Sequence, residues 1–337
     1  MDEVGLMFGL VRAALERRQA DGMEAVEASG WWRLFRLAQQ NHVAALVADA
    51  LPAGVPRDVL MPWLAEREKV AARHRYQRQV QQQVEEVMQQ HGITTLVLKG
   101  THTAQYYPQP ELRDFGDIDL YFFNRHDEAD TVVAHELHVA VDRHAHHHTR
   151  YDLRGVTVES HFDFVNRHYP PSNRRYEEML KTLAPSATFE VLFLLRHMAG
   201  HFSASRIALR DVVDWALTCR ALEREVDWKT VGDMIGEYGM VNFAAVLNCI
   251  AAERLGIKVP LQKSNVEVSA VERDIVLGSD AVLETGIDGL PRLGWKLRRW
   301  RALAWKRKMV YNDNQTLLLM ASMTAHTMKP QSILHKM

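Results

Sequence analysis

The sequence predicts a mixed α+β protein in which a small mixed sheet is flanked by an N-terminal and a C-terminal helical region. Stretches typical of strands gather between residues 96 and 165, whereas apolar residues recur at helical spacing before and after them. Glycine and proline interrupt the pattern near both borders. We therefore expect a helical region over 1–90, an α/β core over 91–172 and a C-terminal helical domain over 173–337.

Composition narrows the class of protein. With 337 residues and 47% hydrophobic content, the chain can bury a sizeable core. A formal net charge of -1 does not indicate a nucleic-acid-binding protein. Cys219 and Cys249 match no metal-binding spacing and are expected to be buried free thiols in a reducing compartment. The sequence shows neither a signal-like segment nor a run of 18 apolar residues, so we expect a cytoplasmic location and no stable membrane insertion.

The N-terminal region has helical periodicity over residues 4–50, with a break at Gly30. A long amphipathic helix is predicted over 61–90, because a sparse apolar stripe runs through polar residues up to the stop signal His91-Gly92. This helix leads directly into the first strand, so we expect it to pack beside the sheet.

The central region alternates strands with breaks. An apolar strand over 96–98 is followed by Lys99, Gly100 and Thr101, and a second strand carries Asp117 and Asp119. Further elements are predicted as a helix over 128–137 and as strands over 139–141, 149–152 and 156–165. Beyond Pro171 the pattern is helical, with helices expected over 177–183, 186–201, 207–222, 228–238, 242–255, 268–283 and 293–327.

Asp117 and Asp119 are the strongest chemical signal. Residues two apart in a strand point to the same face about 7 Å apart, so both carboxylates share one side while Ile118 packs on the other. Two adjacent negative charges are costly unless a cation lies between them. Carboxylate oxygens suit Mg²⁺, which takes one or two carboxylates together with substrate phosphates.

Lys99, Gly100 and Thr101 predict a phosphate-binding bend. A strand that ends in Lys-Gly-Thr and leads into a helix offers backbone N–H groups to a phosphate, and Gly100 lets the phosphate come close. Lys99 and Arg113 could each pair with a phosphate or form a salt bridge with an acid such as Asp114.

The strand over 156–165 supplies a candidate third carboxylate, Glu159, with Asp163 as the weaker choice. A third acid would allow two metal ions to act on one phosphoryl group. His161 points to the same face as Glu159, where it could orient a carboxylate, contact substrate or serve a structural role.

These motifs resemble a known enzyme pattern. Gly100-Thr101, Asp117-Ile118-Asp119 and a later strand acid resemble the hG[S/T], Dh[D/E] and third-acid pattern of the DNA polymerase β-like nucleotidyltransferase superfamily. More narrowly, LVLKG, YYPQPELRDFGDIDLYF and VESHFDF are similar to the motifs of an uncharacterised bacterial nucleotidyltransferase family, and the resemblance extends over most of residues 30–255.

The resemblance implies a nucleotidyltransferase-type sheet and metal-dependent transfer of a nucleoside monophosphate from an NTP, with ATP expected, to an unknown hydroxyl acceptor. It implies that Asp117, Asp119 and Glu159 are catalytic and hold Mg²⁺ or Mn²⁺. It further implies that Gly100 and Thr101 bind the triphosphate, and we add Lys99, Arg113 and His161 as candidate nucleotide-binding residues. The acceptor could be a small molecule, a protein or RNA.

Three other motifs allow both a structural and a functional interpretation. The histidines at 144, 146, 147 and 148 match no zinc motif, and we interpret them as an exposed loop. We interpret Arg210, Asp211 and Asp214 as an ion pair on a helix, and a position in a substrate cleft is the less favoured interpretation. The basic segment 292–308 has eight basic residues and three tryptophans. We interpret it as a helix packed partly on the body with solvated lysines and arginines, and binding to RNA or to an anionic membrane surface is the alternative.

Two rival functions stay open at this point. A non-catalytic nucleotide-binding or scaffold protein would bind NTP and metal without releasing pyrophosphate. A toxin-like nucleotidyltransferase that modifies RNA ends would use the basic segment 292–308 in its interface.

Overall fold

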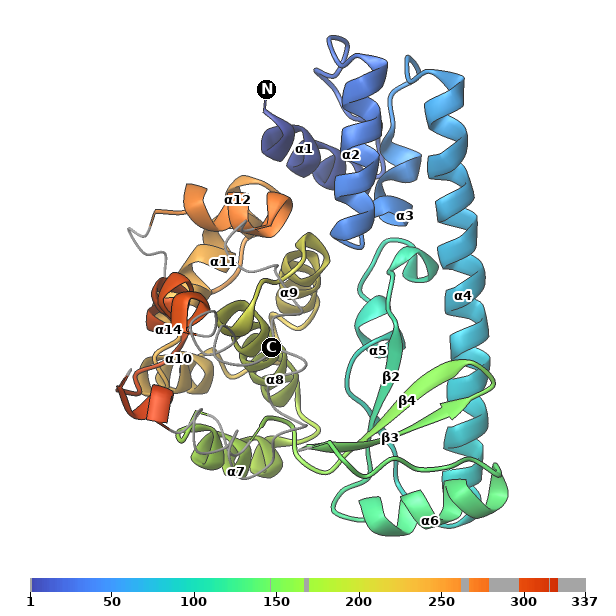
Figure 1. The fold of residues 1–337 in the computed structure, drawn as a ribbon, viewed down its shortest axis with the longest axis vertical. Helices are drawn as coiled ribbons and strands as arrows, with labels where there is room; N and C mark the ends of the chain where they lie inside the picture. Colours follow the sequence, from blue (N-terminus) through green and yellow to red (C-terminus); the bar gives the residue numbers. More distant parts are fainter. Residues whose placement is uncertain are drawn as a thin grey trace. The chain divides into compact units, whose positions relative to one another are not determined.

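The computed structural model describes residues 2–145, 147–166, 170–261, 267–278, 297–314 and 316–320. It confirms the predicted class, since a four-stranded mixed sheet lies among helices (Figure 1). The chain forms two compact units: unit 1 comprises residues 1–168 and 173–185, and unit 2 comprises residues 169–172 and 186–337. The helices of the predicted N-terminal region thus share a unit with the sheet, and the three-part division at 90 and 172 stays a prediction.

The N-terminal part of unit 1 is helical, as predicted, but the predicted break at Gly30 is wrong, because Gly30 lies inside the second helix. The elements are α1 (Glu3–Leu15), α2 (Ala28–Gln40), α3 (Ala44–Val47), the 3-10 helix η1 (Ala48–Ala50) and α4 (Arg57–Gln90). Asp2 is the N-cap of α1, because its carboxylate accepts a hydrogen bond from the backbone N–H of Gly5 at 2.8 Å. The predicted stop of the long helix is confirmed: α4 ends at Gln90, and Gly92 follows with a φ of 66° that suits glycine.

The sheet has the strand order β1-β2-β4-β3. Its strands are β1 (Leu96–Val97), β2 (Asp117–Tyr121), β3 (His148–Leu153) and β4 (Val156–His161). β2 pairs in parallel with β4, whereas the other two pairings are antiparallel. Between the strands lie α5 (Thr101–Ala104), the 3-10 helix η2 (Pro110–Leu112) and α6 (His126–Glu136).

One face of the sheet is apolar and packs against α4 and α6. The buried cluster contains residues of both helices and of β2, β3 and β4, together with Ile93 and Phe122: Val80, Val84, Met88, Ile93, Ile118, Leu120, Phe122, Ala129, Val133, Tyr151, Leu153, Val156 and Val158. The expectation that α4 packs beside the sheet is therefore confirmed. Because side chains alternate along a strand, the residues between these apolar positions point to the opposite face.

Two predicted strands differ from the structure. The strand expected over 139–141 is absent from this described stretch; His138 has a φ of 53°, and only the following Asp142 forms an isolated bridge with Arg150. β4 ends at His161 rather than at 165, because the carboxylate of Glu177 accepts the backbone N–H groups of Phe164 and Val165, both at 2.9 Å from Oε2. Glu177 thereby fixes the segment that leaves the sheet.

The C-terminal half is helical, as predicted. The elements are α7 (Asn173–Leu183), which belongs to unit 1, and, in unit 2, α8 (Ala187–Ala204), α9 (Leu209–Ala221), α10 (Trp228–Glu237), α11 (Val241–Glu253), α12 (Ser269–Leu277) and α14 (Ala304–Val310). The predicted helices over 268–283 and 293–327 extend into residues outside the described ranges. Cys219 and Cys249 are buried free thiols, as expected. None of the helices in the described ranges combines the length and apolar content needed to span a bilayer.

The described part of the basic segment, residues 297–308, packs within unit 2. Lys306 is fully buried and pairs with Asp274 at 2.5 Å, and its ammonium group also donates to the backbone oxygen of Ser205. Arg299 donates to the backbone oxygen of Ala204 at 2.7 Å. For these residues the interpretation as a helix packed partly on the body is confirmed, but the expectation that its lysines and arginines are solvated is wrong for Lys306 and Arg307, which are buried. Residues 292–296 lie outside the described residues.

Candidate active site

The polar face of the sheet gathers acidic side chains from two adjacent parallel strands. Asp119 of β2 lies opposite Glu159 of β4, and Tyr121 lies opposite His161. Side-chain alternation puts Asp117, Asp119, Glu159 and His161 on the face opposite the apolar cluster. Asp119 and His161 are buried, whereas Asp117 and Glu159 are half-buried.

Each of the two paired carboxylates lies beside basic side chains. Oδ1 of Asp119 lies 3.2 Å from the ammonium nitrogen of Lys99 and 3.0 Å from Nε2 of His161. The carboxylate of Glu159 lies 3.4 Å from Nε2 of His148 and 3.7 Å from Nε2 of His161. The acids therefore form a compact negative site that already attracts positive groups.

Burial and mutual repulsion shape the charges of this site. Burial, and then the negative charge of Asp119, raise the pKa of Asp117 above its ordinary value, with Lys99 acting in the opposite direction. Burial would also raise the pKa of Glu159, but the hydrogen bond from His161 and the charge of His148 outweigh it and leave that pKa lowered. The negative charges of the neighbouring acids therefore destabilise the ionised carboxylate of Asp117, and a bound cation would stabilise it.

His161 is held as a counter-charge between the acids. Burial alone would lower the pKa of His161, but its hydrogen bonds to Asp119 and Glu159 raise that pKa to about 9. Its other ring nitrogen, Nδ1, faces the backbone oxygen of Asp163 at 3.3 Å. The ring is therefore oriented from both sides, with Nε2 toward the carboxylates.

Gly100 forms a sharp bend next to the start of β2. Its φ of 63° and ψ of -115° are open to glycine and strained for other residues. A Cβ at this position would lie 3.3 Å from the ring of Phe115 and 3.6 Å from the backbone oxygen of Asp117. Arg113 is buried and donates to the backbone oxygen of Gly100 at 3.1 Å. Arg113 supports the bend from within, and its direct contact with phosphate stays a prediction.

Thr101 begins the short helix α5. α5 has four residues, so its dipole contributes little to phosphate binding. The hydroxyl of Thr101 donates to the side-chain oxygen of Gln81 on α4. Binding of triphosphate by Gly100 and Thr101 stays a prediction, and it depends on the bend rather than on a helix terminus.

The donor set fits a divalent cation. Ligand atoms of Asp119, Glu159 and His161 all lie within 4.8 Å of one another, and Asp117 follows two residues away on the same face. Carboxylate oxygens are the ligands that Mg²⁺ prefers, and an added imidazole nitrogen also suits Mn²⁺. Among the predicted metal ligands, the structure brings Asp119 and Glu159 together, and Asp117 lies beside this group without belonging to it.

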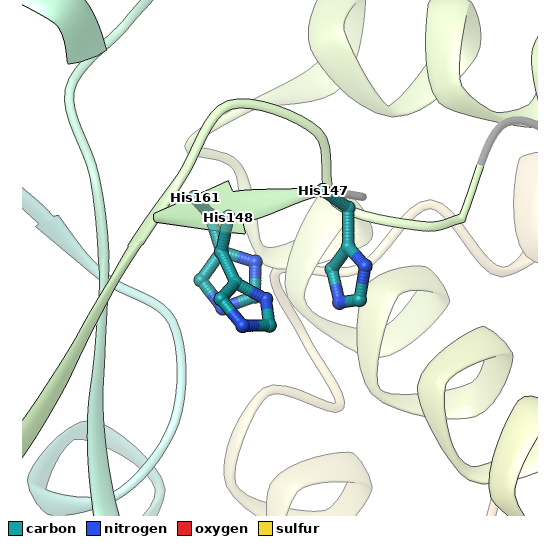
Figure 2. Close-up of side chains that lie close together, drawn as sticks. All are labelled: His147, His148 and His161. Carbon is teal, nitrogen blue, oxygen red and sulfur yellow. The ribbon is translucent and has the colours of Figure 1, made fainter. Parts of the chain in front are cut away.

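Sequence reasoning missed two histidines at this site. His148 is buried, which contradicts its interpretation as part of an exposed loop, because β3 pairs His148 directly with His161. His147 is half-buried and its ring lies near both, as Figure 2 shows. His144 is exposed as expected, and His146 lies outside the described residues. The antiparallel register of β3 and β4 was the missing information, since the spacing of the histidines alone carries no signal.

The ion pair expected on α9 is confirmed. Arg210 lies 2.8 Å from Asp211 and 4.0 Å from Asp214. Asp211 also accepts the backbone N–H of Ala208 at the start of the helix. These contacts give the three residues a structural role within unit 2.

Replacing Gly100 with alanine should weaken nucleotide binding more than its effect on stability explains. The added Cβ contacts Phe115 and the positive φ is strained, so we expect the free energy of unfolding to fall by about 1–2 kcal/mol. Gly155→Ala is the matched control, because Gly155 also has a positive φ of 80° but open space around its Cα. Thermal unfolding and NTP titration of both variants test this: equal NTP affinity of the two would contradict a role for the bend.

A family model described as uncharacterised nucleotidyltransferase matches residues 27–256, which is more than half of the 337 residues and includes the entire sheet. No curated protein and no solved structure matches the chain. The family match confirms the resemblance seen in the sequence motifs. The chain therefore belongs to the uncharacterised nucleotidyltransferase family, a family of transferase enzymes.

Proposed function

We propose that this protein is a cytoplasmic, Mg²⁺- or Mn²⁺-dependent enzyme that transfers a nucleoside monophosphate from an NTP, with ATP as the expected donor, to a hydroxyl acceptor. The observation that carries the proposal is the register of Asp119 against Glu159 on adjacent parallel strands, next to Lys99 and the Gly100 bend. Nucleotidyl transfer needs mainly positioning and charge neutralisation, and this arrangement offers both.

Asp117 and Asp119 would hold the metal ion on the triphosphate. A divalent ion held there would neutralise the phosphate oxygens and favour departure of pyrophosphate. Lys99 holds Asp119 by its ion pair and adds positive charge close to the phosphates. Gly100 gives the phosphates access to the backbone, and Arg113 keeps the bend in shape.

Glu159 would accept the proton of the acceptor hydroxyl. Glu159 is half-buried on the polar face and lies opposite Asp119 on the adjacent strand, which supports this role because its carboxylate would face an acceptor bound beside the metal ion. The hydroxyl oxygen forms a bond to the α-phosphorus, the bond from that phosphorus to the bridging oxygen breaks, and pyrophosphate leaves. His161 orients Glu159 and Asp119 in this step through its contacts with both.

The proposal is tested by incubating the protein with each α-labelled NTP, Mg²⁺ or Mn²⁺ and a cell extract. We expect label in one extract component together with release of pyrophosphate, and no label when the same NTP carries its label on the γ-phosphate. Asp117→Asn should lose the transfer. Binding of NTP without pyrophosphate release under all these conditions would contradict the proposal and favour a non-catalytic nucleotide-binding protein.

A preference for RNA as acceptor finds little support in the basic segment. Within its described residues 297–308, Lys306 and Arg307 are buried, and Arg299 donates a hydrogen bond to a backbone oxygen of unit 2. We therefore leave the acceptor class to the labelling experiment, in which nuclease and protease treatment of the labelled component distinguishes RNA from protein.

A further inference from the structure

We propose that His147, His148 and His161 form a second, nitrogen-rich site that binds a transition-metal cation of the Zn²⁺ or Co²⁺ type (Figure 2). The proposal goes beyond the proposed transfer reaction, which uses neither His147 nor His148 and which needs a metal ion bound mainly by oxygen. The site lies where β3 begins and β4 ends, whereas Asp117 lies opposite Thr157, near the other end of β4.

The distances between the three imidazoles suit a shared ion. Their ligand nitrogens all lie within 4.8 Å of one another. The ring centroids are separated by 4.6 Å for His147 and His148, 5.5 Å for His147 and His161, and 5.2 Å for His148 and His161. Three imidazoles that bind one tetrahedral ion at about 2.0–2.1 Å have centroids about 5 Å apart. Small rotations of the rings, together with release of the His161 proton on metal binding, therefore complete the site.

The backbone holds all three histidines in place. His148 and His161 are directly paired in the antiparallel ladder between β3 and β4, so their side chains share the polar face. The backbone oxygen of His147 accepts the N–H groups of Phe162 at 3.1 Å and Asp163 at 3.2 Å. The three rings thus start from anchored main-chain positions rather than from a free loop.

Supporting contacts are also present. The carboxylate of Glu159 lies 3.4 Å from Nε2 of His148, close enough to orient that ring. Nδ1 of His161 faces the backbone oxygen of Asp163, and Lys181 holds the side chain of Asp163 at 2.8 Å. Such contacts orient metal-binding histidines in known sites.

One ring nitrogen at this site is unsatisfied. Nδ1 of His147 is buried and has no hydrogen-bond partner among the residues that the structure describes. A buried polar atom without a partner costs free energy, and a metal ion would remove that cost. Imidazole nitrogens favour Zn²⁺, Co²⁺ and other transition metals over Mg²⁺, so this site and the carboxylate site should select different ions.

The experiment is a titration of the metal-free, full-length protein with CoCl₂, followed by visible absorption and by measurement of bound cobalt. We expect one Co²⁺ per chain, an intense band typical of tetrahedral cobalt, and loss of that band when ZnCl₂ is added. His148→Ala and His147→Ala should each weaken Co²⁺ binding at least about 10-fold. His147→Ala keeps the test valid if the buried His148 proves necessary for folding.

Two control variants make the outcome specific. His144→Ala changes an exposed histidine of the same segment and should bind Co²⁺ as the unchanged protein does. Asp117→Asn should keep the cobalt band while losing binding of Mg²⁺ with NTP, so failure of this proposal and failure of the proposed function give different results. Wild-type Co²⁺ affinity in both the His147 and His148 variants, or no tetrahedral band in the unchanged protein, would overturn the proposal and leave the three rings as ordinary packing contacts.

Discussion

Replacing Asp119 with asparagine should reduce metal-dependent nucleotidyl transfer by at least about 100-fold. Asp119 is buried on the polar face of β2, opposite Glu159 and in contact with Lys99 and His161. The amide keeps the shape of the side chain but removes the negative charge that would hold the metal ion. Initial rates of pyrophosphate release, measured at saturating NTP and over a range of Mn²⁺ concentrations, give the size of the loss.

Two further variants separate loss of chemistry from loss of fold. Asp117→Asn should cause a comparable loss of rate, and its side chain is half-buried, so its effect on folding should be smaller. Asp152→Asn is the matched control, because Asp152 points to the same face at the far strand β3, opposite Thr157, and is exposed. Full activity of Asp119→Asn or of Asp117→Asn, with a normal circular dichroism spectrum, would show that the altered carboxylate holds no essential metal.

Replacing Lys306 with alanine should lower the free energy of unfolding of unit 2 by about 3–5 kcal/mol. The ammonium group of Lys306 is fully buried 2.5 Å from Asp274, which is itself buried. Burial lowers the pKa of Lys306, and the hydrogen bond that its ammonium group donates to Asp274 opposes this shift. Removing the lysine leaves a buried carboxylate without its counter-charge, and thermal unfolding should detect a fall of about 10 °C.

The pair is tested further by a double variant and an exposed control. Lys306→Met combined with Asp274→Leu removes both charges and should recover most of the lost stability, since burial of a charge pair is itself costly. Lys229 forms a similar pair with Asp233 at 2.7 Å, but both side chains are exposed, so Lys229→Ala should leave the melting temperature unchanged. Equal effects of Lys306→Ala and Lys229→Ala would mean that Lys306 is solvated and that the basic segment is free to contact a partner.

The acidic part of the site could be predicted because it depends on local periodicity. Asp117 and Asp119 share a face in any strand, and Glu159 shares a face with His161 for the same reason. The sequence also indicated the bend at Gly100, since a glycine between an apolar strand and a polar segment permits a conformation that other residues avoid. Parallel pairing of β2 with β4 then brought Asp119 next to Glu159.

What could not be predicted depends on contacts between distant residues. The pairing of His148 with His161 follows from the register of β3 and β4, which no spacing within the histidine run reveals. β4 ends early because the carboxylate of Glu177 on α7 accepts hydrogen bonds from the backbone N–H groups of Phe164 and Val165. Arg113 likewise turned out to support the Gly100 bend, because its buried guanidinium reaches a backbone oxygen 13 residues away.

The most direct measurement is a crystal structure of the protein with Mn²⁺ and an NTP analogue that cannot undergo transfer. Anomalous difference density locates Mn²⁺ independently of any assumption about its ligands. The present account predicts a peak bound by oxygens of Asp117 and Asp119, near Glu159, with the triphosphate against Gly100 and Thr101. Mn²⁺ and triphosphate bound elsewhere on the protein, with these carboxylates contacting only Lys99 and His161, would contradict it.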